Sequence, residues 1–210
     1  MKKHIAREYF EAIAIALILA FLIREVVVQA YKIPSGSMKD TLLIGDHLLV
    51  SKMSYGYKLP NELPFSRTKV FDDIRFFEST PERFDIIVFK YPVDMTRDFI
   101  KRVIGLPGET LEIKKQVVYI DGKKIDDSFT KHLESPLPAA LSFPRDDLGP
   151  VVIPPGTVFV MGDNRENSQD SRFWGFLDVN LIKGKAIVFY WSWDAQTNSI
   201  RWDRIGNLIH

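Results

Sequence analysis

The sequence contains no cysteine in 210 residues. Without cysteine the protein can form no disulfide, no thiolate nucleophile and no cysteine-ligated zinc or iron centre. Its four histidines are scattered along the chain, at His4, His47, His132 and His210. Their spacing excludes a clustered histidine metal site. An excess of charge is also missing, because 28 Lys and Arg oppose 27 Asp and Glu, and this balance argues against nucleic-acid binding through charge.

The chain also lacks a long uninterrupted apolar run. Residues 12–23 are apolar throughout, but as a helix they span about 18 Å, against about 30 Å for the hydrocarbon core of a bilayer. An extension over residues 9–31 places the polar residues near both ends, where long side chains reach the headgroups. We therefore expect a cytoplasmic N-terminus at residues 1–8 and one transmembrane helix at 9–31. The alternative is a secretory signal that is cut near Ala30.

Short β-branched and aromatic runs replace helical periodicity after residue 31, and 46% of the chain is hydrophobic, which is ample for a core. The expected strands are His47–Lys52, Ile86–Tyr91, Phe99–Ile104, Val117–Ile120, Val158–Met161 and Ala186–Trp193. Asp121-Gly122 predicts a type I′ hairpin turn. Residues 128–155 are rich in Pro, Ser and Asp and predict a long surface segment. Residues 32–210 are thus expected to form a mostly β domain.

A short segment rich in serine and glycine follows the apolar region, at residues 33–38. Pro34 and Gly36 predict an abrupt turn that places the hydroxyls of Ser35 and Ser37 close together. Such a segment is compatible with a solvated linker. It is equally compatible with a serine nucleophile, which needs a neighbouring base to accept its proton.

Residues 99–104 offer such a base. In a strand Lys101 and Arg102 point to opposite faces, so one of the two cations should be pressed against apolar neighbours. Burial disfavours the ammonium form and would lower the pKa of Lys101 toward the range where a neutral amine accepts protons. The Arg102 guanidinium stays charged and cannot act in this way.

A third polar segment, residues 162–172, directly follows the predicted strand Val158–Met161. It mixes acids, arginines, amides and hydroxyls. These groups can form hydrogen bonds with one another, as the groups that support a reactive site must.

Together these three segments resemble the boxes of the bacterial type I signal peptidase (leader peptidase) family, in order and spacing, over residues 33–172. The resemblance implies a coiled antiparallel β-sheet catalytic domain, no metal or organic cofactor, and an enzyme of the cytoplasmic membrane that acts on its outer face. It also implies that the partners are secretory preproteins and the lipid bilayer. Several boxes in register are far more specific than a single serine motif.

The resemblance also implies roles for individual residues. The nucleophile falls on Ser37 and the lysine general base on Lys101. Ser35 matches the side-chain donor to the oxyanion, and Ser168 matches the serine that orients the lysine. A membrane-bound serine endopeptidase with a Ser/Lys dyad is the expected function.

The remaining matches are supporting or substrate-binding residues. Asp170 and Arg172 match a supporting ion pair. Ile33, Met38 and Ile100 match residues that line pockets for small side chains before the cut.

This sequence departs from the family at three positions: Asp40 replaces proline, Glu166 replaces aspartate, and Phe84 stands where glycine commonly precedes the Asp-Ile-Ile-Val strand. Asp40 matters most, since a negative charge near the lysine would raise its pKa.

Three other functions remain open from the residues alone. One is a histidine-based enzyme with His47 or His132 as its base. The second is a membrane-tethered β module that binds extended peptides without cutting them. The third is a self-cleaving regulator with the same chemistry, although such regulators normally carry a DNA-binding head.

Overall fold

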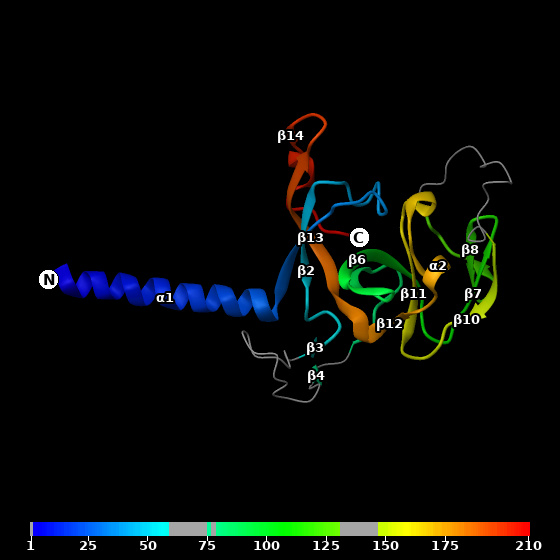
Figure 1. Ribbon diagram of the computed structural model, residues 1–210, viewed down its shortest axis with the longest axis horizontal. Coiled ribbons are helices and arrows are strands. Elements are labelled where there is room, and N and C mark those ends of the chain that lie inside the picture. Colours follow the sequence, from blue (N-terminus) through cyan, green and yellow to red (C-terminus); the bar gives the residue numbers. More distant parts are fainter. Residues whose placement is uncertain (1, 59–74, 77–78, 131–146) are drawn as a thin grey trace.

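The computed structural model describes residues 2–58, 75–76, 79–130 and 147–210, and within them the chain is mostly antiparallel β-structure, as the sequence predicts (Figure 1). The elements are α1 (Lys2–Val26), β1 (Val28–Lys32), β2 (Asp46–Ser51), β3 (Tyr57–Lys58), β4 (Arg75–Phe76), β5 (Ile86–Tyr91), β6 (Asp94–Gly105), β7 (Thr110–Lys114), β8 (Val117–Ile120), β9 (Lys123–Lys124), β10 (Leu148–Val152), β11 (Thr157–Met161), η3 (Arg165–Asn167), α2 (Ser171–Trp174), β12 (Leu177–Asp178), η4 (Val179–Leu181), β13 (Ile182–Asp194), β14 (Ser199–Ile200) and η5 (Trp202–Arg204).

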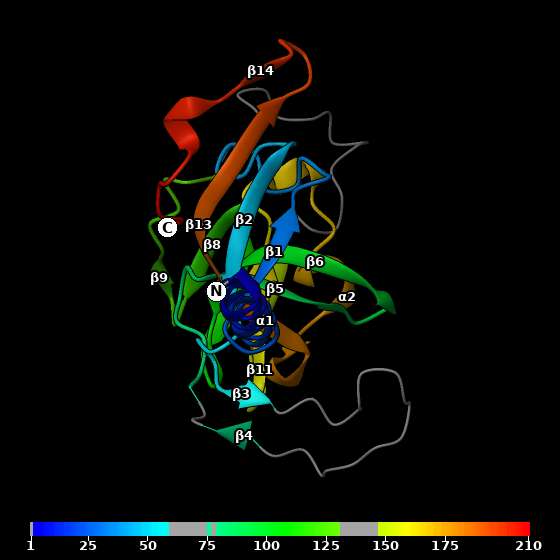
Figure 2. The same cartoon turned by 90° about the vertical axis from the view of Figure 1, so that its left-hand side faces the viewer.

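The main sheet has the strand order β1-β2-β13-β5-β6-β11-β12, and β14 pairs with the far end of β13. In Figure 2 the long strand β13 lies beside β2 and carries β14 at its tip. β13 pairs with β2 on one side and β5 on the other, so it joins the N-terminal strands to β6 and β11. This arrangement brings the serine segment after β1 close to the lysine on β6.

Helix α1 differs from the expected helix at 9–31. It begins at Lys2 and ends at Val26, and Val28–Lys32 forms β1 instead, which pairs with residues 47–51 of β2 in an antiparallel ladder. The physical reason is the β-branched run that ends the helix, because valine fits a pleated strand and β2 offers an unpaired edge. The helix-to-strand junction is a single residue, Val27, whose carbonyl accepts a hydrogen bond from the Lys52 amide at 2.9 Å.

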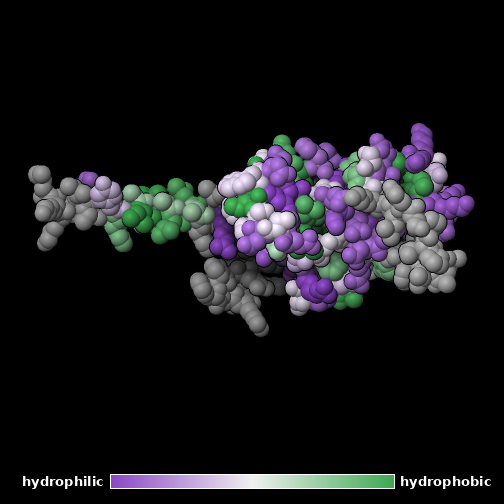
Figure 3. Space-filling view, turned by 90° about the horizontal axis from the view of Figure 1, so that it is seen from above, coloured by the Kyte–Doolittle hydropathy of each residue, from purple (hydrophilic) through white to green (hydrophobic). Residues whose placement is uncertain are grey.

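Within the described residues, no helix is both long enough and apolar enough to span a bilayer. In Figure 1 α1 projects away from the β domain, and in Figure 3 the surface of its middle part is largely apolar.

A smaller sheet in the order β10-β7-β8-β9 lies at the end of the molecule opposite α1 (Figure 1). The predicted hairpin turn is confirmed, since Asp121 and Gly122 join β8 to β9 with φ values of 49° and 75°. The predicted surface segment at 128–155 is partly wrong, because Leu148–Val152 pairs with β7 as strand β10. Residues 131–146 lie outside the described part of the chain.

Strand β5 explains how the core is divided. Its side chains alternate between two buried clusters: Ile86 and Val88 pack on one face of the sheet, and Ile87 and Phe89 pack on the other. A strand buried on both faces must be apolar at successive positions, which accounts for its unbroken run. A third cluster fills the space beside the smaller sheet. The candidate active site lies where β6 meets these packed clusters.

Candidate active site

Ser37 and Lys101 meet although 64 residues separate them. The Lys101 Nζ lies 2.9 Å from the Ser37 Oγ and donates a second hydrogen bond to the Ile100 carbonyl at 2.8 Å. Ser37 lies in the turn after β1, while Lys101 lies on β6, where it is only 3% exposed. The structure therefore provides a serine hydroxyl and a desolvated amine in direct contact.

The electrostatic surroundings of Lys101 favour a neutral amine. Burial lowers the pKa of Lys101 to about 8, against the opposing charges of Asp170 and Asp163. The amine also lies 5.2 Å from the centre of the Phe99 ring. No carboxylate in the described chain forms an ion pair with it, so an uncharged amine can accept a proton near neutral pH.

The strand pattern predicted that one of the two neighbouring cations is pressed against apolar side chains, and in the structure both Lys101 and Arg102 are buried. Arg102 is 2% exposed and forms a two-pronged pair with Asp163, with distances of 2.9 and 2.8 Å. Asp163 also accepts a hydrogen bond from the Thr41 hydroxyl at 2.6 Å. One carboxylate thus joins the serine segment, β6 and the polar segment after β11. The sequence holds no signal for this pairing across 61 and 122 residues.

The polar segment is fastened directly to the turn that carries Ser37. The Asn164 amide donates to the Ser37 carbonyl at 3.2 Å, and the Asn164 side chain donates to the Gly36 carbonyl at 3.0 Å. Gly162 permits this approach, because a Cβ there would lie 2.2 Å from the Ser168 Oγ and 2.5 Å from the Ser37 carbonyl oxygen. Gly162 and Asn164 are positioning residues that the sequence analysis did not single out.

Asp170 and Arg172 form an ion pair, with Nε and NH2 of the arginine each 2.8 Å from a carboxylate oxygen. Burial raises the pKa of Asp170, but the hydrogen bonds and charge of Arg172 outweigh it and lower the pKa overall. Asp170 also accepts from the Gly162 amide at 3.0 Å. The pair therefore supports the backbone that touches the serine turn.

Ser168 is 5% exposed and lies beside Gly162. Its buried hydroxyl lies close enough to the Asp170 carboxylate to help lower the pKa of that group, and the two hydrogen bonds of Lys101 go to Ser37 and Ile100. A neutral amine has one lone pair and two N–H groups, so the lone pair can face Ser37 while one N–H remains for a further acceptor. The role of Ser168 in orienting the lysine stays a prediction.

A cleft of about 730 Å³ opens onto the Ser37–Lys101 contact. Its lining consists of Pro34, Ser35, Ser37, Arg97, Asp98, Phe99, Ile100, Lys101, Glu166, Asn167, Ser168, Gln169 and Phe173. Ser35 is exposed in it, beside Ser37. The cleft therefore presents both predicted serines and the lysine to one bound molecule.

The three predicted substrate-binding residues are not equally accessible. Ile100 is half-buried and lines the cleft. Ile33 and Met38 are 2% and 0% exposed and belong to the core cluster against which Ile100 packs. In this structure only Ile100 of the three reaches the cleft surface.

One edge of β6 is open along the cleft. β5 pairs with β6 from Asp94 to Arg102, but on the other side β11 pairs only with Arg102, Val103 and Gly105. Among the described strands, none pairs with the backbone from Asp98 to Lys101 on the side away from β5. An open strand edge of this kind is where an extended peptide can add as a further strand.

The histidine alternative finds no support at His47. Its Nδ1 lies 3.1 Å from the Gly45 carbonyl oxygen, and its ring packs edge-on against Tyr190, whereas the Ser37 hydroxyl contacts Lys101. His132 lies outside the described residues. Among those that are described, no three His, Asp or Glu side chains gather closely enough to hold a metal ion.

Two of the departures from the family have a clear structural setting. Phe84 has a φ of 74°, a backbone conformation that glycine adopts most easily, and its ring packs against Phe129. Asp40 is exposed, and the carboxylates that act on the pKa of Lys101 are Asp170 and Asp163. Asp40 is thus not one of the charges that oppose a neutral lysine.

Known proteins similar to this chain match it over most of its length. The model of the family described as "Signal peptidase, peptidase S26" matches residues 6–191. The signal peptidase I of Pseudomonas aeruginosa is 31% identical over 241 aligned residues, which cover 100% of this chain and 81% of that protein. A probable signal peptidase I-1 of Synechocystis is 35% identical, covering 96% of this chain and 88% of its own. The signal peptidase I of Rickettsia typhi is 32% identical, with coverages of 97% and 86%.

Among solved structures, the crystal structure of a signal peptidase I from Enterococcus faecalis is 32% identical, with a TM-score of 0.44. The match covers 51% of this chain and 97% of that one.

Proposed function

The chain belongs to the signal peptidase family, peptidase S26, and is a peptide hydrolase of that family; from this premise we propose that it removes signal peptides from exported preproteins with a dyad of Ser37 and Lys101. The observation that supports the dyad is the 2.9 Å contact between the Ser37 hydroxyl and a buried amine. A lysine with a pKa of about 8 is neutral in about a tenth of the molecules at pH 7, which is sufficient for a general base.

The proposed reaction begins with a substrate carbonyl held over Ser37. The neutral Lys101 amine takes the hydroxyl proton while the Ser37 oxygen forms a bond to the carbonyl carbon. Collapse of the tetrahedral intermediate breaks the peptide bond, and the lysine ammonium gives the proton to the departing amine. Water, deprotonated by the same amine, then releases the acyl group from Ser37.

Ser35 is proposed to stabilise the oxyanion together with the backbone amide of Ser37. The exposed Ser35 hydroxyl lines the same cleft as the nucleophile, and a donor of this type contributes about 3 to 4 kcal/mol in acyl-transfer enzymes. The ties from Asn164 to the carbonyls of Gly36 and Ser37 hold this turn in place. A preorganised turn avoids reorganisation when the charge develops.

The substrate is proposed to bind as an extended strand along the open edge of β6. The unpaired backbone groups from Asp98 to Lys101 would form hydrogen bonds with the residues before the cut. Ile100 supplies an apolar wall beside the dyad, which suits small side chains at these positions. Ile33 and Met38 would contribute only as the core beneath that wall.

The test of the dyad is cleavage of a purified preprotein by the full chain in a nonionic detergent. Ser37→Ala should reduce the rate by about 10⁴-fold or more, because no nucleophile remains. His47→Gln and His132→Gln should retain nearly full activity and serve as matched controls. A shortened product from Ser37→Ala would refute the dyad. A stable complex without product from the native chain would instead indicate the peptide-binding alternative.

We also propose that α1 tethers the enzyme to the cytoplasmic membrane as a single pass, with the β domain on the extracytoplasmic side. The helix has 25 residues, or a length of about 37 Å, and its isoleucine and leucine side chains from Ile13 to Leu19 are 53–66% exposed. The transfer of such side chains from water into the apolar part of a bilayer is favourable. The basic residues at the chain start favour a cytoplasmic N-terminus.

The tether predicts that the full chain remains with membranes after alkaline carbonate extraction. Leu17→Arg should release a large fraction, because arginine at the centre of a spanning helix costs about 2.5 to 3.5 kcal/mol. Val152→Arg is the control, since Val152 is equally exposed but lies on β10, in the smaller sheet. Equal retention of both variants would contradict the tether.

A further inference from the structure

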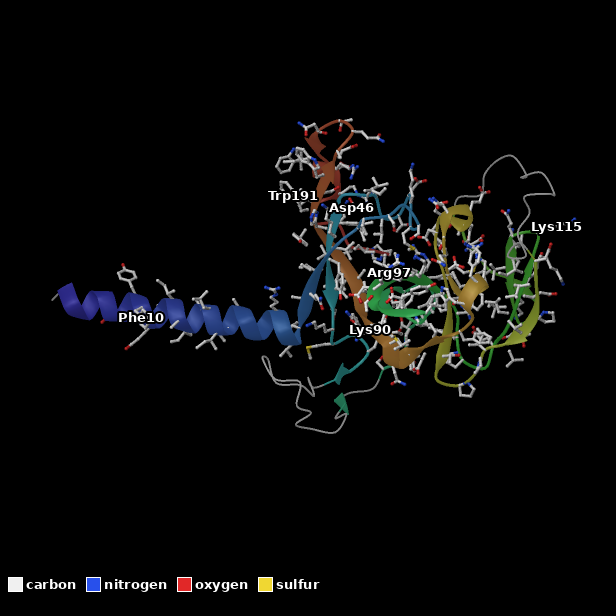
Figure 4. All side chains as sticks on the ribbon, viewed as in Figure 1. Phe10, Asp46, Lys90, Arg97, Lys115 and Trp191 are labelled. Atoms are coloured by element: carbon white, nitrogen blue, oxygen red, sulfur yellow. The ribbon has the colours of Figure 1, made fainter. Side chains whose placement is uncertain are left out.

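The lining of the cleft includes residues beyond the dyad, and one of them is a second cation, Arg97. Arg97 lines the same cleft as Ser37 and Lys101, and its side chain is exposed there. Figure 4 labels Arg97 on β6, in the body of the main sheet. Nothing in the catalytic steps uses this residue. Its position on the cleft wall raises the question of what a bound peptide would present to it.

The backbone around Arg97 is irregular in a way that directs the side chain. Lys90 and Tyr91 are neighbours on β5, but their partners on β6 are Asp98 and Asp94. The three residues between those partners, 95–97, therefore form a bulge outside the ladder. Bulges re-aim side chains and are common next to active sites.

Stacking holds the Arg97 guanidinium in place. Its central carbon lies 5.3 Å from the centre of the Phe99 ring and 6.0 Å from that of Tyr91, and these two rings are themselves stacked at 4.2 Å. A guanidinium on an aromatic face keeps the N–H groups at its edge free for carboxylate or carbonyl oxygens. Arg97 is thus an oriented donor, and less side-chain entropy is lost when it binds.

The charged groups around Arg97 leave its guanidinium available for a bound substrate. In the described part of the chain no carboxylate lies within ion-pair distance of it. Asp98, its neighbour in the cleft, is paired with Lys183 at 2.7 Å. The pKa of Asp94 is lowered mainly by hydrogen bonds from Thr96, and the charge of Arg97 contributes less. Glu166 also lines the cleft, on the segment that carries Ser168.

The distance along β6 identifies the part of the substrate that Arg97 would meet. Arg97 is four residues from Lys101, which is about 13 Å of extended chain. If the residues before the cut follow the open edge from Lys101 toward Asp98, the fourth or fifth of them lies beside Arg97. The other direction along β6 is closed, because β11 pairs with it from Arg102 onward.

We propose that Arg97 is a specificity-determining residue that selects substrates with an acidic side chain, and disfavours a basic one, at the fourth or fifth residue before the cut. This inference rests on the proposed function, since it takes the bound strand to be a signal peptide seated on β6. The carboxylate would receive hydrogen bonds from the edge of the stacked guanidinium. A lysine at the same place would meet a like charge.

The test compares peptides that carry Glu, Ala or Lys at the fourth or the fifth position before the cut, as purified full-chain enzyme in nonionic detergent cleaves them. For the native chain, kcat/KM should be about fivefold higher for a Glu peptide than for its Lys counterpart at one of these positions, as expected for a partly exposed charge pair. Arg97→Gln should bring that ratio close to one, and Arg97→Glu should invert it. Cleavage of the Ala peptide gives each variant its own reference value, against which kcat/KM for the Glu and Lys peptides is compared.

Lys115→Gln is the matched control, because it removes one exposed cation from the turn between β7 and β8, far from the cleft (Figure 4). It changes the net charge of the chain as much as Arg97→Gln and should leave the ratio unaltered. A native ratio near one at both positions, or a ratio that persists in Arg97→Gln, would overturn the proposal. So would an effect of Arg97 that is equal for all peptides and appears only when anionic lipid is added. Loss of Ala-peptide cleavage by the native chain would instead count against the proposed function.

Discussion

Replacing Lys101 by methionine is expected to abolish cleavage and, at the same time, to stabilise the folded protein. Cleavage should fall by about 10⁴-fold or more, because methionine fills a similar volume but cannot accept the proton of Ser37. Stability should rise because the fold now buries an amine whose pKa is lowered from 10.5 to about 8. That difference corresponds to about 3 kcal/mol at pH 7, which the unfolded state recovers by charging the amine.

The destabilisation caused by the buried Lys101 amine should depend on pH. Between about pH 8 and 10.5 the unfolded chain binds a proton at Lys101 that the folded chain has lost, so the free energy of unfolding rises with pH in this window. Lys101→Met should be the more stable protein below pH 8 and should lose this advantage by about pH 10.5. Denaturant unfolding at several pH values measures the difference.

The activity of the native enzyme should follow the titration of the same amine and should also rise with pH. Because only the neutral amine acts as the base, kcat/KM should rise as the pH passes about 8 and level off above it. A flat profile from pH 6 to 9, or a Lys101→Met variant that retains cleavage, would contradict the assignment of the base.

Removal of the Asp163 carboxylate should destabilise the protein more than any other single change in the polar network. Asp163→Ala leaves the Arg102 charge 2% exposed and without its two-pronged partner, and such an orphaned charge costs about 3 to 5 kcal/mol. Thr41 loses its hydrogen bond in the same variant. Chemical denaturation should therefore show a much lower free energy of unfolding.

The control is Glu112→Ala, which removes a carboxylate paired with Lys114 at the surface and should cost less than about 1 kcal/mol. A second variant, Arg102→Met combined with Asp163→Leu, removes both charges and should recover much of the lost stability. If Asp163→Ala costs no more than Glu112→Ala, the network around Arg102 does not stabilise the fold as the structure indicates.

The sequence was informative where chemistry is local. The Asp121-Gly122 turn follows from the preference of two adjacent residues for positive φ, and the structure confirms it. The burial of Lys101 follows from its place in an apolar strand. Its contact with Ser37, in contrast, needed the resemblance to a family, because residue patterns do not show which strand meets which loop.

Other features were decided by tertiary contacts. Valine at position 28 suits either a helix in lipid or a strand, and pairing with β2 decides for the strand. Gly149 and Pro150 suggest a loop, yet both lie in strand β10, which pairs with β7. The strand pattern required burial of one of the two cations Lys101 and Arg102, and the position of Asp163 explains why Arg102 is buried as well as Lys101.

The junction between α1 and β1 has a consequence for how substrates arrive. With Val27 alone between them, and with the backbones of Arg24 and Val27 both held by Lys52, the helix has no linker about which to swing. A protein retained at a surface through a flexible tail samples every orientation, whereas this one keeps its cleft at a set angle and height above whatever surface holds α1. Peptides emerging from that surface would meet Ser37 from a single direction.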